Sequence, residues 1–581
     1  MSASAADVDT AADAGRAASP ARNGSGRTGA YLLLIILVFL TLYPLAMLLY
    51  GALSTAPPGE LGSFDLRGFR ELWNAATAKV LLDTLSLSVV KTTLGVALAV
   101  LLAWIVTRTD TPGRGTLEVL LSLPFFIPPI LLAMGWSMLG NPTVGTINLW
   151  WNALTGAEEP LVNVFSFGGV VWHMIQFTVP FAFLLLVDAF RAMDPSLEES
   201  SRMSGASRMG TFFRITLILM LPIISNVFIL SLIKGLEAFE GPLFFGLPAG
   251  IHVVTTEIYE AIHHRNVPDY QYATALSFST MAVMCLVVAW QWRLLRGRRF
   301  ETVTGKGYSP NVMKLGWLRW VTFGICAATF LIMTVMPVGQ LIAGSLVEFY
   351  GFYSWDALTL KHYRAVFDNA LLWRSTRNTL ILAVGGATLT TILGSLISYV
   401  VVRTRWPIRY AIDLLAWLPW MMPGMVLGLG FLWGFALLPR GIDIYGTLWA
   451  LLFAYMTLGT PLTVRIMSGA FTQLSVDLEE CSRVHGANWW QTFRRILLSL
   501  TFPSFAVGWV LTFFMILREL SASVLLYSVG NEVMPVVILR MWEEGKAEEV
   551  SVVALFMLLL VLAFRVMQLI IVKRRFGGLQ H

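Results

Sequence analysis

Long apolar runs separated by short polar stretches dominate the chain. Twelve of these runs approach the roughly twenty apolar residues that a transmembrane helix needs. The candidate spans are Tyr31–Leu53, Thr84–Val106, Leu117–Leu139, Gly168–Phe190, Ile215–Leu236, Tyr272–Trp292, Trp317–Leu341, Leu380–Val402, Ile412–Trp433, Tyr445–Met467, Ile496–Leu517 and Ser551–Val572. Residues 1–28 lack apolar periodicity and are rich in Ala, Ser and Gly, which is typical of a disordered tail. We therefore predict an all-α membrane protein with about 12 transmembrane helices.

Basic residues are distributed unevenly between these runs. If the runs are alternating spans, 25 of the 41 Lys and Arg residues fall on one side of the membrane. They include Arg108, Arg114, Arg403, Arg405 and Arg409. Cytoplasmic loops retain positive charge. The distribution therefore predicts that these loops, the tail and both termini are cytoplasmic.

Two segments of the chain repeat each other. The segment Leu197–Pro222 recurs as Leu478–Pro503, an offset of 281 residues, and 14 of its 26 positions are identical. Earlier in each copy, Leu-Pro124-Phe-Phe-Ile-Pro128 recurs 295 residues later as Leu-Pro419-Trp-Met-Met-Pro423. We interpret the chain as two six-helix repeats that enter the membrane the same way round, which makes them parallel repeats.

The composition excludes several classes of protein. The chain is 56% hydrophobic and 13% charged, with a mean hydropathy of +0.70, so it lacks the polar surface of a cytosolic enzyme. Its three cysteines are far apart and predict neither a disulfide framework nor a zinc site. The net charge of +6 follows from membrane orientation, so we expect no nucleic-acid partner.

The repeated segment contains the strongest candidate for a functional surface. It predicts a short amphipathic helix, a sharp turn at a glycine and a second helix, lying along the membrane with charged groups towards the cytosol. We call Glu198–Arg214 the first loop and Glu479–Arg495 the second loop. The candidate residues are Glu198, Glu199, Arg202, Gly205, Ala206, Arg214, Glu479, Glu480, Arg483, Gly486, Ala487 and Arg495. Such a surface suits docking into a groove of another protein.

These loops resemble the cytoplasmic signature of ATP-binding-cassette (ABC) importer permeases. That signature is Glu-Ala-Ala, three residues, Gly, nine residues, Ile, one residue and Leu-Pro. Glu199, Gly205, Ile215 and Leu217 match it, as do Glu480, Gly486, Ile496 and Leu498. Ser200-Ser201 and Cys481-Ser482 replace the alanine pairs, and Ile218 and Ser499 replace the proline. Because the chain has two such loops, it is most similar to permeases with two fused type I domains, above all the ferric-iron group.

The resemblance implies a complete transport system around this chain. Two copies of an ABC ATPase subunit would dock on the loops, and an extracytoplasmic solute-binding protein would deliver the solute, in a bacterial inner membrane. The chain has no Gly-x-x-x-x-Gly-Lys-Ser/Thr motif, so we expect ATP and Mg²⁺ to bind the partner ATPase and no cofactor to bind this chain. Ferric iron is the expected solute, and thiamine, phosphonate and polyamine are alternatives.

We divide the chain on this basis. Residues 1–28 form the cytoplasmic tail, 29–300 the first permease repeat with a core at about 80–292, 301–316 a cytoplasmic linker, and 317–581 the second repeat with a core at about 376–572. A secondary transporter of the major facilitator type also has two parallel six-helix repeats. It gives no reason for paired loops after the fourth and tenth spans.

A few charged residues lie at predicted membrane depth, where they are costly and indicate function. Candidates for the translocation pathway are Lys234, Glu237 and Glu240 at the end of the fifth span and Arg518 and Glu519 at the matching end of the eleventh. The alternative is that Lys234 and Glu237 form a helix-end ion pair. His263-His264-Arg265, near Glu257 and Glu260, is either a metal site or a solvated loop.

Overall fold

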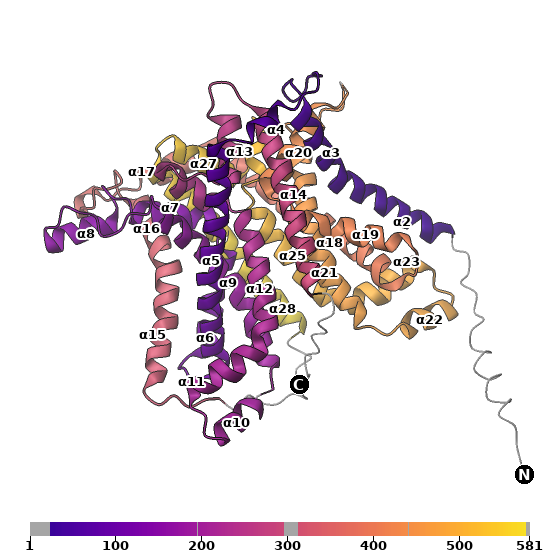
Figure 1. Cartoon of the computed structure of the whole chain (residues 1–581), viewed down its shortest axis with the longest axis horizontal. Helices are drawn as coiled ribbons and strands as arrows, with labels where there is room; N and C mark the ends of the chain where they lie inside the picture. The colour runs from indigo at the N-terminus through magenta and orange to yellow at the C-terminus, as the bar shows by residue number, and fades with distance from the viewer. Residues whose placement is uncertain (1–23, 195, 296–311, 440, 577–581) are drawn as a thin grey trace, which may run out of the picture.

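The computed structural model describes residues 24–194, 196–295, 312–439 and 441–576. These residues form helices and loops, with three isolated β-bridges and no strand longer than a bridge among them. Eight helices within the described residues are long and apolar enough to cross a membrane, and three bent helix pairs raise this number to at most eleven. Helix α14 (Tyr270–Leu295) occupies the range of the sixth predicted span. The all-helical prediction is therefore confirmed, and Figure 1 shows the arrangement.

The first half of the chain combines long helices with short helical turns. In chain order they are α2 Gly24–Leu37, η1 Val38–Leu42, α3 Tyr43–Leu53, α4 Arg67–Glu71, α5 Ala75–Arg108, α6 Arg114–Ser122, η2 Leu123–Phe126, α7 Pro129–Leu139, α8 Thr146–Thr155, α9 Phe167–Ala192, α10 Ser196–Met203, α11 Arg208–Thr211, η3 Phe212–Thr216, α12 Leu217–Leu236, η4 Pro242–Gly246, η5 Leu247–Ala249, α13 Val254–His263 and α14. Helix α2 begins at Gly24, inside the range predicted for the tail. Residues 1–23 of that tail lie outside the described residues.

The second half follows the same order of long helices. It contains α15 Leu318–Phe330, η6 Leu331–Val335, α16 Met336–Leu346, η7 Trp355–Ala357, α17 Lys361–Phe367, α18 Ala370–Arg403, α19 Ile408–Trp417, η8 Leu418–Met421, α20 Gly424–Ala436, α21 Leu448–Thr472, α22 Asp477–Val484, α23 Trp489–Thr492, η9 Phe493–Leu497, α24 Leu498–Leu500, α25 Phe502–Leu517, α26 Ser523–Leu526, α27 Met534–Glu543 and α28 Ala547–Phe576. Helices α5 and α18 both have 34 residues, and α10 and α22 both have eight. Of the predicted linker, residues 301–311 lie outside the described residues.

The third and ninth predicted spans are broken rather than straight. The chain bends by 95° between Arg114–Phe126 and Pro129–Leu139, and by 112° between Ile408–Met421 and Gly424–Ala436. Pro128 and Pro423 lie at these breaks with extended backbones (ψ 129° and 141°). Because a residue before proline is pushed out of the helical region, Ile127 and Met422 are extended too. The eleventh span is likewise bent, by 77°, between Trp489–Leu500 and Phe502–Leu517.

The first long helix of each half packs against the other half. Helix α3 packs on α20, and α16 packs on α7. At both crossings a glycine faces a backbone carbonyl: a Cβ on Gly430 would lie 2.5 Å from the oxygen of Pro44, and one on Gly135 would lie 2.5 Å from the oxygen of Pro337. Small residues allow helix backbones to approach this closely. Because α3 also packs on α14 and α16 on α28, each of these helices lies between its own half and the other half.

Helices α5 and α18 run in the same sense between two ends of the molecule. At one end, the backbone N–H groups of Val254 and Met534 donate to the hydroxyl oxygens of Thr84 and Thr379 (3.0 and 2.9 Å). At the other end, Arg108 and Arg403 pair with the two loops, as described below. The 25 residues from Thr84 to Arg108 extend about 36 Å as a helix, enough for a hydrocarbon core of about 30 Å. We call these the far end (α13 and α27) and the loop end (α10 and α22).

Candidate coupling loops and charged cluster

Both loops fold as a helix, a tight turn and a second helix. Two residues beyond the ends of helices α10 and α22 lie Gly205 and Gly486, whose φ angles of 87° and 81° are in the left-handed region. The two glycine N–H groups donate to the carbonyls of Arg202 and Arg483 (3.0 and 2.9 Å). A glycine in this conformation is a common C-terminal cap because it has no Cβ to clash. The glycine turn predicted from the sequence is therefore present in both loops.

A matched pair of hydroxyl groups joins the two helices of each loop. The Ser201 and Thr211 hydroxyls lie 3.1 Å apart, and those of Ser482 and Thr492 lie 2.8 Å apart. A π-helical turn follows each second helix, η3 in the first loop and η9 in the second. These contacts fix the angle between the two helices, so each loop is a formed surface.

An arginine at the end of each long helix holds the loop to the bundle. The Nη2 atom of Arg108 donates to the carbonyls of Phe190 and Met193 at 2.6 and 2.8 Å. That of Arg403 donates to the carbonyls of Phe471 and Leu474 at 2.8 and 2.9 Å. These carbonyls lie at or near the C-terminal ends of α9 and α21, where helical partners are lacking. The arginines therefore cap the helices that lead into the loops.

The same arginines face the first glutamate of each loop. Arg108 Nη1 lies 3.8 Å from Glu198 Oε2, and Arg403 Nε lies 3.4 Å from Glu479 Oε1. Glu198 Oε1 also accepts a hydrogen bond from the Thr216 hydroxyl at 2.6 Å. Neither arginine Nε has an aligned hydrogen-bond partner, so the contacts of Arg108 and Arg403 with the glutamates are ion pairs held mainly by charge.

The structure thus corrects part of the sequence interpretation. The notion that all charged groups of the loops face outward is wrong for Glu479, whose side chain is 4% exposed, and largely wrong for Glu198, at 12%. Both turn inward because a buried arginine lies behind them. The residues Arg202, Gly205, Ala206, Arg214, Glu480, Arg483, Gly486 and Arg495 are exposed, while Glu199 and Ala487 are half-buried.

Asp194 adds a negative charge at the start of the first loop. Its Oδ1 accepts the backbone N–H of Ser196, the first residue of α10, at 2.8 Å. This hydrogen bond, with a second from the Ser196 side chain, holds the pKa of the Asp194 carboxyl below its usual range. An ionised carboxylate beside a helix N-terminus interacts favourably with the helix dipole. Asp194 therefore helps to fix the point at which α10 begins.

Replacing Gly205 or Gly486 by alanine is expected to destabilise the corresponding loop. No atom lies within 4 Å of the added Cβ, so the cost comes from the left-handed backbone alone and is about 1–2 kcal/mol. Hydrogen exchange of the loop amides should rise about tenfold or more for the variant loop and stay unchanged in the other. Asparagine, which tolerates this conformation better, is the matched control and should cost less. If the amides of the second loop exchange hydrogen equally slowly in Gly486→Ala and in the unmodified chain, this account is wrong.

The predicted pathway residues come together from both halves. Lys234 Nζ lies 2.7 Å from Glu237 Oε2, the helix-end ion pair expected as the alternative. Glu240 and Glu519 lie close enough to Arg518 to interact with its charge. The ammonium of Lys91, buried in α5, donates to the Ser231 carbonyl at 2.7 Å and interacts with Glu237. Three cations and three carboxylates make this cluster formally neutral.

Two cations of this cluster reach across to the opposite half. Lys234 lies 5.0 Å from the ring centroid of Trp420, in η8, and Arg518 lies 5.0 Å from that of Phe125, in η2. Phe125 and Trp420 occupy matching positions of the repeat, 295 residues apart, at the broken spans. A cation over an aromatic face is attracted by the ring. The cluster therefore joins the broken span of each half to the C-terminal end of a helix in the other half: η8 to α12, and η2 to α25.

The comparisons with known proteins agree with the two-half arrangement. The family described as "Binding-protein-dependent transport system inner membrane component" matches the chain twice, at residues 93–300 and 377–577. The Ferric transport system permease protein FbpB of Actinobacillus pleuropneumoniae is 27% identical over 89% of this chain and 74% of its own length. The Fe(3+)-transport system permease protein FbpB 2 of Haemophilus influenzae is 24% identical over 91% and 95%.

One shorter relative matches only part of the chain. The Spermidine/putrescine transport system permease protein PotC of Escherichia coli K12 is 28% identical over 39% of this chain and 84% of its own length. The two family matches together cover well over half of the 581 residues. The chain therefore belongs to the family of binding-protein-dependent transport system inner membrane components, and it is a multi-pass ABC permease subunit rather than an enzyme.

Proposed function

We propose that this chain forms both permease halves of an ABC importer for ferric iron in a bacterial inner membrane. Two copies of an ATPase subunit dock at the loop end, one on each loop, and bind ATP and Mg²⁺. An extracytoplasmic binding protein delivers the solute at the far end. The carrying observation is that two loops of matched geometry lie after corresponding helices, α9 and α21, and are held there by matched arginines.

The membrane topology belongs to the same proposal. The three bent pairs count as one span each, and α14 supplies the twelfth. The loop end and both termini then face the cytoplasm, in accordance with the positive charge of those segments. We divide the chain as expected from the sequence, into a tail at 1–28, repeats at 29–300 and 317–581, with cores at about 80–292 and 376–572, and a linker at 301–316. ATP-driven closure of the ATPase pair would rock the two halves between inward-open and outward-open states.

The exposed or half-buried loop residues are the proposed docking contacts. Glu199 and Glu480 match the signature glutamate, and Arg202, Arg214, Arg483 and Arg495 are exposed in the same loops. Gly205, Ala206, Gly486 and Ala487 let the partner approach the backbone at the turn. Glu198 and Glu479 contribute from inside the bundle by joining each loop to α5 or α18.

The double variant Glu199→Ala/Glu480→Ala tests this docking. A hydrogen bond to a charged group contributes about 1.5–3 kcal/mol, so each alanine should weaken ATPase binding about tenfold or more. In proteoliposomes with the partner ATPase and binding protein, uptake should fall while ATP hydrolysis no longer responds to loaded binding protein. Membrane insertion should stay unchanged.

Glu158→Ala/Glu159→Ala is the matched control. These two glutamates are exposed and lie in the loop after α8, so the variant loses the same charge away from both loops. It should keep coupled uptake. Normal coupled uptake in the Glu199→Ala/Glu480→Ala variant would refute the proposed docking mode.

Ferric iron is proposed as the solute because two relatives that match most of this chain are ferric permeases by name. Thiamine, phosphonate and polyamine remain alternatives, and the polyamine permease matches only 39% of the chain. Lys234, Glu237, Glu240, Arg518 and Glu519 are the proposed pathway residues. Uptake of labelled ferric iron, spermidine, thiamine and a phosphonate into cells with and without this chain separates these solutes. Uptake of spermidine but not iron would contradict the assignment.

A further inference from the structure

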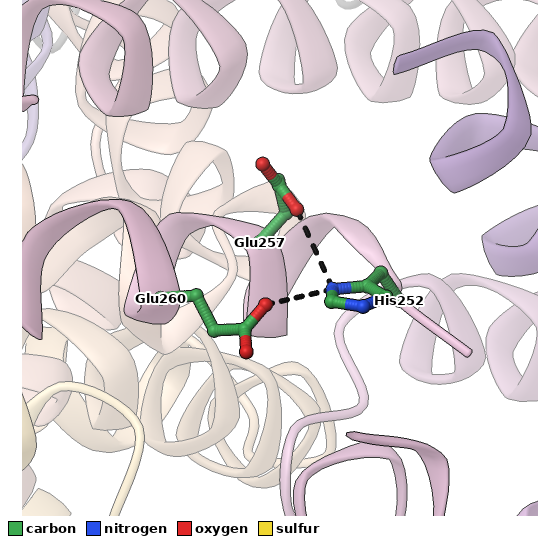
Figure 2. A group of neighbouring side chains, drawn as sticks. All are labelled: His252, Glu257 and Glu260. Atoms are coloured by element: carbon green, nitrogen blue, oxygen red, sulfur yellow. Dashed lines mark ion pairs between the residues drawn. The ribbon is translucent and has the colours of Figure 1, made fainter. Parts of the chain in front are cut away.

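Three metal-ligating side chains meet at the far end of the first half. His252 lies just before α13, and Glu257 and Glu260 lie three residues apart on that helix (Figure 2). His252 Nδ1 is 2.7 Å from Glu260 Oε2 and 3.6 Å from Glu257 Oε2. All three ligand atoms lie within 4.8 Å of one another. The predicted neighbours His263 and His264 are not part of this cluster.

The local backbone holds His252 in place. The N–H of Ile251 donates to the Gly246 carbonyl at 2.9 Å, and the N–H of Val253 donates to the Thr256 hydroxyl at 3.0 Å. The next N–H, that of Val254, donates to Thr84 on α5. The residues on both sides of His252 are therefore fixed to the bundle, so the imidazole is positioned before any ligand arrives.

The close contact of the His252 Nδ1 atom with Glu260 is not a well-aligned hydrogen bond. Nδ1 is almost fully covered although the His252 side chain is 35% exposed, and it has no hydrogen bond of acceptable geometry. Arg265 Nη2 lies 2.9 Å from Glu257 Oε1, and this contact orients Glu257 Oε2 towards His252. Within the described residues, Glu260 has no ion pair other than the one with His252.

In the second half, the position that matches His252 holds a residue that forms an ion pair within the protein. Glu532 stands one residue before the cap residue of α27, as His252 does for α13, and it forms a two-point ion pair with Arg374 (3.1 and 3.0 Å). Val537 and Arg540 stand where Glu257 and Glu260 stand. A cation supplied by the protein therefore balances the charge there. In the first half, Arg265 balances Glu257, whereas Glu260 pairs only with His252 among the described residues.

We propose that His252, Glu257 and Glu260 bind a divalent first-row transition-metal ion such as Zn²⁺. An imidazole with two carboxylates is a donor set that these ions favour over Mg²⁺ or Ca²⁺. Ligands about 2.0–2.2 Å from a metal lie about 3.0–3.6 Å from one another, which small side-chain movements reach from the observed spacing. Binding requires the neutral imidazole with its proton on Nε2. None of the three residues belongs to the charged cluster described above.

The site lies beside a contact between the halves. On the same helix, the Tyr259 hydroxyl donates to Glu543 Oε1, at the end of α27, at 2.9 Å. A bound ion would tie the start of α13 to its first two turns. It would thus rigidify the helix that touches the second half, at the end of the molecule opposite the loops.

Zn²⁺ titration of the full-length chain in lipid nanodiscs tests the proposal. The affinity tag is removed and the protein is treated with chelator first. Calorimetry should show one saturable site, and Zn²⁺ should raise the thermal midpoint by mass action. His252→Gln and Glu260→Gln should each weaken binding by about 10–100-fold and abolish the rise in the midpoint.

His264→Ala is the matched control because this exposed histidine lies four residues beyond Glu260 and outside the cluster. It should bind Zn²⁺ as the unmodified chain does. Both Gln variants are close in size to the native residues, and their midpoints without metal report whether they fold. The proposal is overturned if the unmodified chain has no saturable site, or if His252→Gln binds Zn²⁺ as tightly as the unmodified chain.

Discussion

Replacing Arg403 by alanine is expected to destabilise the second half by about 3–5 kcal/mol, because it leaves a buried carboxylate without its cation. Arg403 is 6% exposed, and its guanidinium donates to the carbonyls of Phe471 and Leu474 while facing Glu479. The remaining cation near Glu479, Arg483, is 59% exposed and its charge is screened by solvent. The measurement is the thermal midpoint of the purified chain together with protease sensitivity of the second loop.

Arg405→Ala is the matched control for Arg403→Ala. It removes the same charge two residues away from an exposed side chain, so it should change stability by less than about 0.5 kcal/mol. The double variant Arg403→Ala/Glu479→Ala should recover part of the loss, because no unpaired carboxylate remains. Equal midpoints for Arg403→Ala and Arg405→Ala would show that the buried pair does not hold the loop.

The repeat and the loops could be predicted from the sequence because both are local patterns. Two segments with 14 of 26 identical positions specify the same helix, turn and helix twice. The glycine turn needs only a residue without a Cβ, and Gly205 and Gly486 adopt the predicted conformation. Local chemistry was sufficient for these features.

The roles of Arg108 and Arg403 could not be predicted from charge distribution alone. The distribution indicates a topology determinant at each position, whereas both side chains are buried helix caps. Their partners lie 82 and 68 residues away along the chain, so the contact depends on how α5 packs on α9 and α18 on α21. One signal was available: the arginines and the loop glutamates recur together in both repeats.

The breaks in two predicted spans also had a signal in the sequence. Pro128 and Pro423 recur at matching positions, and proline with its restricted predecessor ends a helix. Hydropathy averaged over about twenty residues does not reveal such a break, because Ile127 and Met422 are as apolar as the helices around them. No sequence pattern marked His252 as a candidate metal ligand. A single histidine in a loop becomes one only because α13 brings two carboxylates beside it.

Alanine at Gly430 or Gly135 is expected to destabilise the packing between the halves by about 1–3 kcal/mol each. The added Cβ would meet a backbone oxygen at 2.5 Å, which no side-chain rotation can relieve, so α3 must move away from α20, or α16 from α7. Because the two crossings share no residue, the stability lost by the double variant Gly135→Ala/Gly430→Ala should equal the sum of the two single losses. The thermal midpoint of the chain in lipid nanodiscs measures this loss.

Gly385→Ala separates this packing effect from the effect of alanine on a helix. Gly385 lies inside α18, and nothing lies within 4 Å of its added Cβ, so alanine there should stabilise the chain by up to about 1 kcal/mol through helix propensity. If the thermal midpoint rises for Gly385→Ala and falls for Gly430→Ala, the halves are joined by close backbone contact. In the proposed rocking mechanism, the crossings of α3 and α16 would then carry the movement of one half into the other. A Gly430→Ala variant as stable as the unmodified chain would remove this link between the two halves.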